Sequence, residues 1–244
     1  MYSRKFALET PDTPAFIMAS TGETVTHREY DERANRLAHL LRAAGLQRGD
    51  HYALFMENNN RFLEVCAAGE RAGLYYTPVN SYLKADELAY IVQNSESQIL
   101  ITSRSRREVA MEAAAMCPRL KLCLIVDGTG DDGNFLDYAT EVAKFPSTPI
   151  EDESLGVSMM YSSGTTGRPK GILRPLQDSA PDTPLPLWGF LDGLWKYRDG
   201  MRYLSPAPLY HSAPQAAVGL TLRRGGTVID RKSTRLNSSH VKRS

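Results

Sequence analysis

Short runs of apolar and β-branched residues alternate with segments of helical apolar spacing through the first half of this sequence, and this alternation constrains the fold more than any other feature. The helical segments are predicted at 26–45, 58–73, 85–94 and 105–116. The strand-like runs lie at 51–56, 74–79, 98–102 and 121–126. Strands that alternate with helices form βαβ units, in which helices cover both faces of a parallel sheet. The sequence therefore predicts an α/β fold with mostly parallel sheets flanked by helices.

Helix ends and helix faces can be predicted more closely at three places. Thr26 and Glu29 have the spacing of a capping box at the start of the first helix. The asparagines at 58–60 are suited to cap the second helix. A later amphipathic helix is predicted at 187–197, with Leu194 and Trp195 turned inward.

The middle of the chain is less regular. Residues 127–154 are rich in Asp, Gly, Pro and Ser, which predicts a surface connection with one short helix. We expect a subdomain boundary near 145–155. The apolar residues 155–160 then predict a buried strand.

The composition is that of an ordinary globular protein of 244 residues, with 42% hydrophobic and 23% charged residues. A net charge of +1 provides no strong field for nucleic acid or an anionic membrane, so neither is expected as a partner. The three cysteines lack metal-ligand spacing, and no metal ligand is predicted. The longest compact apolar run, 122–126, is far below the roughly 20 residues of a membrane span. Since the N-terminus also lacks a signal-peptide pattern, we expect a cytoplasmic protein.

The last fourteen residues, 231–244, differ from the body of the chain. They contain five Lys/Arg and no Asp/Glu, with Leu236 and Val241 as the sizeable apolar residues. Such a segment cannot bury enough surface to fold independently. A basic interaction arm is one interpretation. We favour a disordered tail of foreign sequence, because the string resembles a recurrent adapter-derived end of conceptual translations, and we assign residues 1–230 to one partial domain.

The richest concentration of chemical groups lies at 161–171, YSSGTTGRPKG, directly after the apolar run 155–160. It combines four Ser/Thr hydroxyls, three glycines and two cations. Glycines let backbone N–H groups approach a ligand closely, and hydroxyls and a lysine add donors and charge, so the segment suits a polyphosphate. A polar turn would explain the glycines and the proline but not the density of donors. Pro169 stands where a Walker A loop requires glycine, so that motif is excluded.

The segment 161–171 resembles the phosphate-binding signature of the adenylate-forming enzymes, an aromatic residue followed by Thr/Ser-Ser-Gly-Thr-Thr-Gly-x-Pro-Lys-Gly. Every specified position of that pattern is met. Similar segments are ERAGLYYTPVN at 70–80, ADELAYIVQNSESQILIT at 85–102 and PLYHSAP at 208–214. The resemblance covers residues 21–230 and is strongest to bacterial fatty acyl-CoA synthetases. It implies an incomplete N-terminal domain of such an enzyme.

The resemblance implies a reaction in two steps, with ATP, Mg²⁺ and coenzyme A. A small-molecule carboxylic acid, expected to be a fatty acid, is first converted to an acyl-adenylate, and the thiol of coenzyme A then displaces AMP. His211 would flank the substrate carboxylate near the α-phosphate. Lys170 and His211 are the candidate catalytic residues. The residues implied to bind the β- and γ-phosphates are Ser162, Ser163, Gly164, Thr165, Thr166, Gly167 and Lys170.

The sequence also departs from the family. The downstream Gly-Tyr-Gly-x-Thr-Glu element, the Thr-Gly-Asp ribose site and the lysine-bearing C-terminal domain are missing, so we expect this chain alone to be inactive. Two alternatives stay open: a non-catalytic nucleotide- or acyl-binding fragment, and an adenylation domain that loads a carrier-protein thiol. The acyl chain and the oligomeric state are not determined by the sequence.

Overall fold

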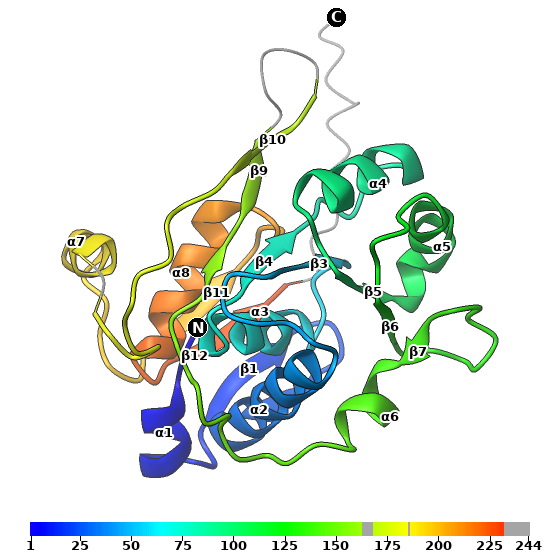
Figure 1. Cartoon of the computed structure of the whole chain (residues 1–244). Coiled ribbons are helices and arrows are strands. Elements are labelled where there is room, and N and C mark those ends of the chain that lie inside the picture. Colours follow the sequence, from blue (N-terminus) through cyan, green and yellow to red (C-terminus); the bar gives the residue numbers. More distant parts are fainter. Residues whose placement is uncertain (163–167, 185, 232–244) are drawn as a thin grey trace, which may run out of the picture.

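The computed structural model describes residues 1–162, 168–184 and 186–231 (Figure 1). Its larger sheet has the strand order β7-β6-β5-β3-β4-β8, and every neighbouring pair is parallel. The predicted α/β fold with a mostly parallel sheet is therefore confirmed. The strands are β3 (His51–Phe55), β4 (Tyr75–Pro78), β5 (Ile99–Ser103), β6 (Leu122–Val126), β7 (Leu136–Asp137) and β8 (Val157–Ser158).

A second sheet joins segments from opposite ends of the described chain. Its strand order is β11-β12-β1-β2. Phe16 lies opposite Val228 where β1 and β12 run parallel. The β11–β12 pair is also parallel, and β2 runs antiparallel to β1. The strands are β1 (Pro14–Met18), β2 (Thr24–Thr26), β11 (Arg202–Ser205) and β12 (Thr227–Asp230).

The helices agree with the predicted alternation. None of the helices within the described ranges is both long and apolar enough to cross a membrane. They are α1 (Arg4–Glu9), α2 (His27–Ala43), α3 (Phe62–Arg71), α4 (Ala85–Asn94), a 3-10 turn (Arg104–Arg106), α5 (Arg107–Ala115), α6 (Tyr138–Val142), α7 (Pro186–Trp195) and α8 (Ser212–Arg223).

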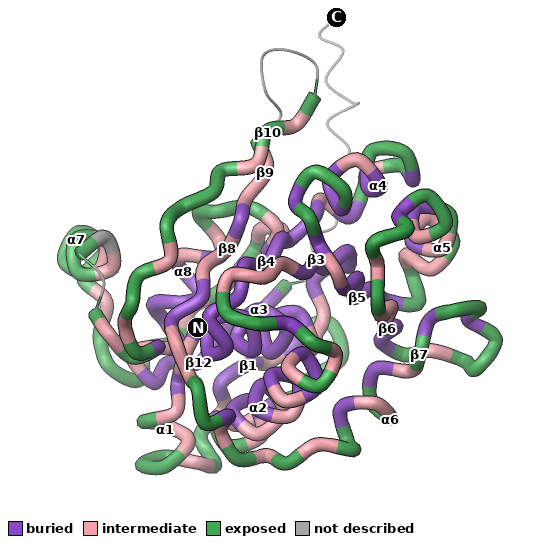
Figure 2. Tube along the Cα trace, viewed as in Figure 1, coloured by how far each residue is buried: buried purple, intermediate pink, exposed green. Residues whose placement is uncertain are grey.

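Alternate residues of the six-stranded sheet enter two separate cores. Leu54 of β3 packs in a core with α2 and α3, whereas the next residue, Phe55, packs in a core with α4 and α5. The first core continues into the four-stranded sheet through Phe16 and Val228. Figure 2 shows the buried residues concentrated along these strands and α3. Burial on both faces explains why the strands have nearly continuous apolar sequences.

A capping box and a buried ion pair fix the position of α2. The predicted capping box is confirmed: the Thr26 hydroxyl accepts from the Glu29 N–H at 3.2 Å, and the Glu29 carboxylate accepts from the Thr26 N–H at 2.8 Å. Arg71, at the end of α3, is fully buried and its guanidinium donates to Asp31 of α2 at 2.8 Å. Losing the Arg71 guanidinium would remove the ion-pair partner of the Asp31 carboxylate, which is destabilising for a charge held away from water.

The structure corrects two predictions. The single strand predicted at 155–160 is divided between β8 and a separate strand, β9 (Met160–Ser162). In α7, Leu194 and Trp195 are 60% and 43% exposed, so their predicted inward orientation is wrong. Helical spacing identifies an apolar face but not whether a neighbour covers it, and α7 lies at the periphery of the molecule (Figure 1).

Candidate active site

The predicted phosphate-binding segment is bracketed by a two-stranded hairpin of β9 and β10 (Lys170–Ile172). The two strands are antiparallel, and Lys170 lies opposite Ser162 in register. Both residues are exposed. The predicted residues Ser163 to Gly167 lie outside the described residues. The structure therefore brings together the two described members of the predicted phosphate set.

The hairpin leaves the body of the protein at the carboxyl edge of the parallel sheet. β8 runs parallel to β4, and the chain continues from β8 directly into β9. The hairpin projects beyond the helices and sheets in Figure 1. Open parallel sheets bind their ligands outside the carboxyl ends of the strands, so the hairpin is at the expected edge.

Helix α4 contacts strand β9 and the residues just before β10. The Tyr90 hydroxyl donates to the carbonyl of Pro169 at 3.2 Å, and the Tyr161 hydroxyl donates to the Asn94 side-chain oxygen at 2.7 Å. The Arg168 guanidinium lies 5.2 Å from the centre of the Tyr90 ring. Burial raises the pKa of Tyr161, which keeps its hydroxyl protonated as a donor. Helix α4 thus supports the residues that flank the phosphate-binding segment on both sides.

The other candidate catalytic residue, His211, occupies the N-cap position of α8. Its side chain is exposed, and its ring centre lies 4.4 Å from that of Tyr210. The backbone N–H of His211 donates to the carbonyl of Pro208 at 3.3 Å, and its own carbonyl accepts from Gln215 at 3.2 Å. His211 therefore begins α8 with a backbone held on both sides and an imidazole open to solvent.

His211 and Lys170 come from different elements at the same edge. His211 follows the carboxyl end of β11 by six residues, and Lys170 follows the carboxyl end of β9 by eight. Among the residues that the structure describes, no hydrogen bond or ion pair joins the two.

Sequence reasoning missed the role of Asn58. The asparagine that bonds the start of α3 is Asn59. Its side-chain oxygen accepts from the N–H groups of Arg61 and Phe62, at 2.9 and 3.1 Å. Asn58 instead bonds to the segment that leads to His211. The sequence did contain one indication of this role: three consecutive asparagines, at 58–60, precede a helix that needs only one capping residue.

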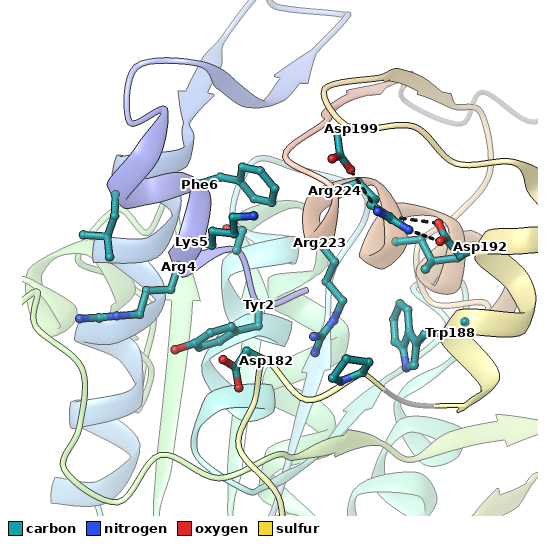
Figure 3. Close-up of a pocket in the computed structure, with 15 residues that line it drawn as sticks. Tyr2, Arg4, Lys5, Phe6, Asp182, Trp188, Asp192, Asp199, Arg223 and Arg224 are labelled. Atoms are coloured by element: carbon teal, nitrogen blue, oxygen red, sulfur yellow. Dashed lines mark hydrogen bonds and ion pairs between the residues drawn. The ribbon is translucent and has the colours of Figure 1, made fainter.

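A cavity of about 680 Å³ lies elsewhere, between α1, α7 and the C-terminal end of α8 (Figure 3). Its lining includes Trp188 and Arg223, whose guanidinium lies 5.3 Å from the centre of the Trp188 ring. None of the described candidate site residues lines it. Because it lies at the opposite end of α8 from His211, we do not assign the phosphate chemistry to it.

The resemblance implies Mg²⁺, so the described residues were searched for groups of metal-ligating side chains. Within residues 1–162, 168–184 and 186–231, no group of three or more His, Cys, Asp or Glu side chains could hold a metal ion. Mg²⁺ needs no such group, because it is commonly held by one or two carboxylates together with substrate phosphates, and no chemical step is assigned to the metal here.

Comparison with curated proteins gives relatives that share part of their length with this chain. A long-chain-fatty-acid–CoA ligase of Mycobacterium tuberculosis, FadD13, is 30% identical over 230 residues, covering 93% of this chain and 43% of the relative. Surfactin synthase subunit 3 of Bacillus subtilis is 33% identical over 161 residues, covering 66% of this chain and 12% of that protein. The chain thus spans less than half of these relatives.

Solved structures agree in fold. The N-terminal domain of FACL13 from Mycobacterium tuberculosis matches with a TM-score of 0.75 and 25% identity, covering 95% of this chain and 56% of that chain. The family model described as AMP-binding enzyme matches residues 3–242. This match covers nearly the whole sequence, and the chain therefore belongs to the family of AMP-binding enzymes.

Proposed function

We propose that this chain is part of an ATP-dependent acyl-CoA synthetase that activates a fatty acid. The observation that carries the proposal is the β9–β10 hairpin at the carboxyl edge, where Lys170 lies opposite Ser162 on either side of the Gly/Thr-rich segment. His211, at the same edge, supplies a group for the acid. The fatty acyl-CoA ligases among the relatives support the choice of substrate class.

In the first step, a carboxylate oxygen of the acid attacks the α-phosphorus of ATP. A bond forms between that oxygen and phosphorus, and the bond between the α-phosphorus and the bridging oxygen to the β-phosphate breaks, releasing pyrophosphate. Negative charge grows on the leaving pyrophosphate. The Lys170 ammonium and the hydroxyl and N–H donors of the Gly/Thr-rich segment would stabilise that charge.

In the second step, the thiol sulfur of coenzyme A attacks the acyl carbon, the thiol loses its proton, and AMP leaves with the former carboxylate oxygen. The product is a thioester. His211 would orient the carboxylate in the first step. The resemblance implies Mg²⁺, which would supply positive charge beside the phosphates when ATP binds.

A second function has its own support. The similarity to surfactin synthase subunit 3 favours an adenylation domain that delivers the acyl group to a carrier-protein thiol. Both functions use the same first step, and they differ only in the thiol that accepts the acyl group. The non-catalytic fragment is the third alternative, in which no adenylate forms.

The test uses the complete protein that contains this chain. Acyl-adenylate formation from ATP and fatty acids is measured first, by exchange of labelled pyrophosphate into ATP. Coenzyme A or a phosphopantetheinylated carrier protein is then supplied. Thioester on coenzyme A supports the proposal, thioester on the carrier alone supports the second function, and no exchange with any carboxylic acid would contradict both.

A further inference from the structure

Asn58 makes an unusual set of hydrogen bonds for a residue that follows a strand. It lies three residues after β3 and is only 7% exposed. Its side-chain oxygen accepts from the N–H of Leu209 at 2.9 Å, and its side-chain nitrogen donates to the carbonyl of Ala207 at 3.1 Å. The same nitrogen donates to the carboxylate of Asp230 at 2.9 Å. One amide thus holds three groups that lie about 150 or more positions away in sequence.

The two backbone bonds follow the pattern of a parallel sheet. A residue in a parallel strand bonds the carbonyl of one residue of its neighbour and the N–H of the residue two positions further on. The Asn58 side chain does the same with Ala207 and Leu209. It therefore acts as a one-residue strand that ties the end of β3 to the segment after β11.

These two bonds hold a segment whose buried backbone groups need hydrogen-bond partners. Leu209 is fully buried, so its N–H cannot turn to water if Asn58 is removed. Leaving a buried donor unpaired costs about 1–3 kcal/mol. The hydrogen bond from the His211 N–H to Pro208 connects the same segment to the start of α8. The orientation of His211 therefore depends on how Ala207 and Leu209 are held.

We propose that Asn58 is a positioning residue for the acid-binding step: by fixing residues 207–209, it sets where the His211 imidazole stands at the start of α8. What His211 does there rests on the proposed function. The hold of Asn58 on residues 207–209 does not. Asn58 touches no substrate in this assignment, and its effect on the reaction passes through His211.

The first experiment uses the 244-residue chain and tests the hold itself. Hydrogen exchange of the Leu209 amide and the ring resonances of His211 are followed by NMR in Asn58→Ala and Asn58→Leu, the second of which keeps most of the side-chain volume. We expect exchange at Leu209 to accelerate by about tenfold or more, with changed His211 resonances. Asn60→Ala is the matched control, since the Asn60 side chain bonds Glu23 instead.

The outcomes of this experiment are distinct. Faster exchange confined to residues 207–211 supports the proposal. Unchanged exchange at Leu209, or an equal acceleration in the Asn60→Ala control, would overturn it. Unfolding of both Asn58 variants would also overturn it, because Asn58 would then serve the fold as a whole rather than one segment.

The second experiment uses the complete enzyme and a double-mutant cycle. We expect Asn58→Ala to slow adenylation by about 10–100-fold, the scale of a misplaced catalytic group, while the KM for ATP changes little. In a His211→Ala background the same change should have almost no further effect. Additive losses would overturn the proposal. If His211→Ala alone leaves adenylation unchanged while Leu209 exchange still responds to Asn58, then the role of His211 in the proposed function fails and the hold stands.

Discussion

Lys170 illustrates how much of the site depends on single residues. Its ammonium is exposed beside a segment rich in donors, and it faces Ser162 across the hairpin. A flexible ammonium can follow charge that moves onto a leaving group. Its contribution should therefore be larger in the transition state than in ground-state binding.

Replacing Lys170 tests this directly in the complete enzyme. Lys170→Met keeps much of the stem and removes the charge, and we expect adenylation to slow by about 10–1000-fold. Transfer from supplied acyl-adenylate to coenzyme A should change much less, because no pyrophosphate is present. The two half-reactions are measured separately, with Lys144→Met, whose ammonium pairs with Glu141, as control. Equal losses in both half-reactions would mean that Lys170 supports the whole site instead.

Asp230 should make stability depend on pH. It is fully buried at the end of β12, and burial raises its pKa to about 6, although the hydrogen bond from Asn58 acts in the opposite direction. A carboxyl whose pKa is raised in the folded state binds its proton more tightly there than in the unfolded chain. Its stabilising effect is therefore present below about pH 4 and is lost as the pH rises through 6.

We expect Asp230→Asn to remove this dependence. Between pH 4 and pH 7, the free energy of unfolding of the wild-type chain should fall by about 1–3 kcal/mol relative to Asp230→Asn. Urea denaturation at the two pH values measures the difference. Asp182→Asn, at an exposed position, should behave like the wild type. A wild-type chain that gains stability relative to Asp230→Asn over this range would reverse the assigned sign.

At the scale of elements, α4 couples the phosphate hairpin to the body of the protein. The helix packs in the core with α5 on one face and donates or accepts two hydrogen bonds at the hairpin. A two-stranded hairpin alone is marginally stable in water. The ordered position of the hairpin strands therefore depends on this helix.

Tyr90→Phe tests the coupling with minimal change. It removes the hydroxyl that donates to Pro169 and keeps the ring under Arg168. Losing one such bond is worth about 0.5–1.5 kcal/mol, so we expect the KM for ATP to rise by about 2–10-fold while the melting temperature changes little. Tyr197→Phe is the matched control, because its hydroxyl also donates to a backbone carbonyl, that of Ala217, away from the hairpin. Equal effects of the two variants on ATP would refute the coupling.

At the scale of the whole molecule, the chain spans only part of the length of its relatives. It covers 43% of FadD13 and 56% of the FACL13 domain. The resemblance implies that a ribose site and a lysine-bearing domain follow the stretch that this sequence shares with the family.

We therefore expect the 244-residue chain alone to form no thioester. ATP- and coenzyme A-dependent product is measured across short, medium and long fatty acids with purified protein, and the complete enzyme serves as the positive control. Turnover at the rate of the complete enzyme would contradict this expectation. It would mean that residues within this chain perform the work assigned to the missing parts.

The features readable from the amino-acid order were local ones. Apolar periodicity located β3 to β6 and α2 to α5 because burial on a face repeats along a strand or helix, and the Thr26–Glu29 box is closed by neighbours in sequence. The hydroxyls, the glycines and Lys170 indicated phosphate binding because they, too, are neighbours in sequence. The resemblance to the AMP-binding family rested on that string together with the segments at 70–80, 85–102 and 208–214, and it was confirmed by the family match.

Long-range pairings came only with the folded chain. The pairing of β1 with β12, the bonds of Asn58 to Ala207 and Leu209, and the uncovered face of α7 each depend on which distant segments meet. A local pattern specifies which side of a helix or strand avoids water, but it does not specify which other element covers that side. The partner is selected by the global arrangement that buries both sheets and satisfies their polar groups together. For this reason, three adjacent asparagines did not reveal which of them bonds Ala207 and Leu209.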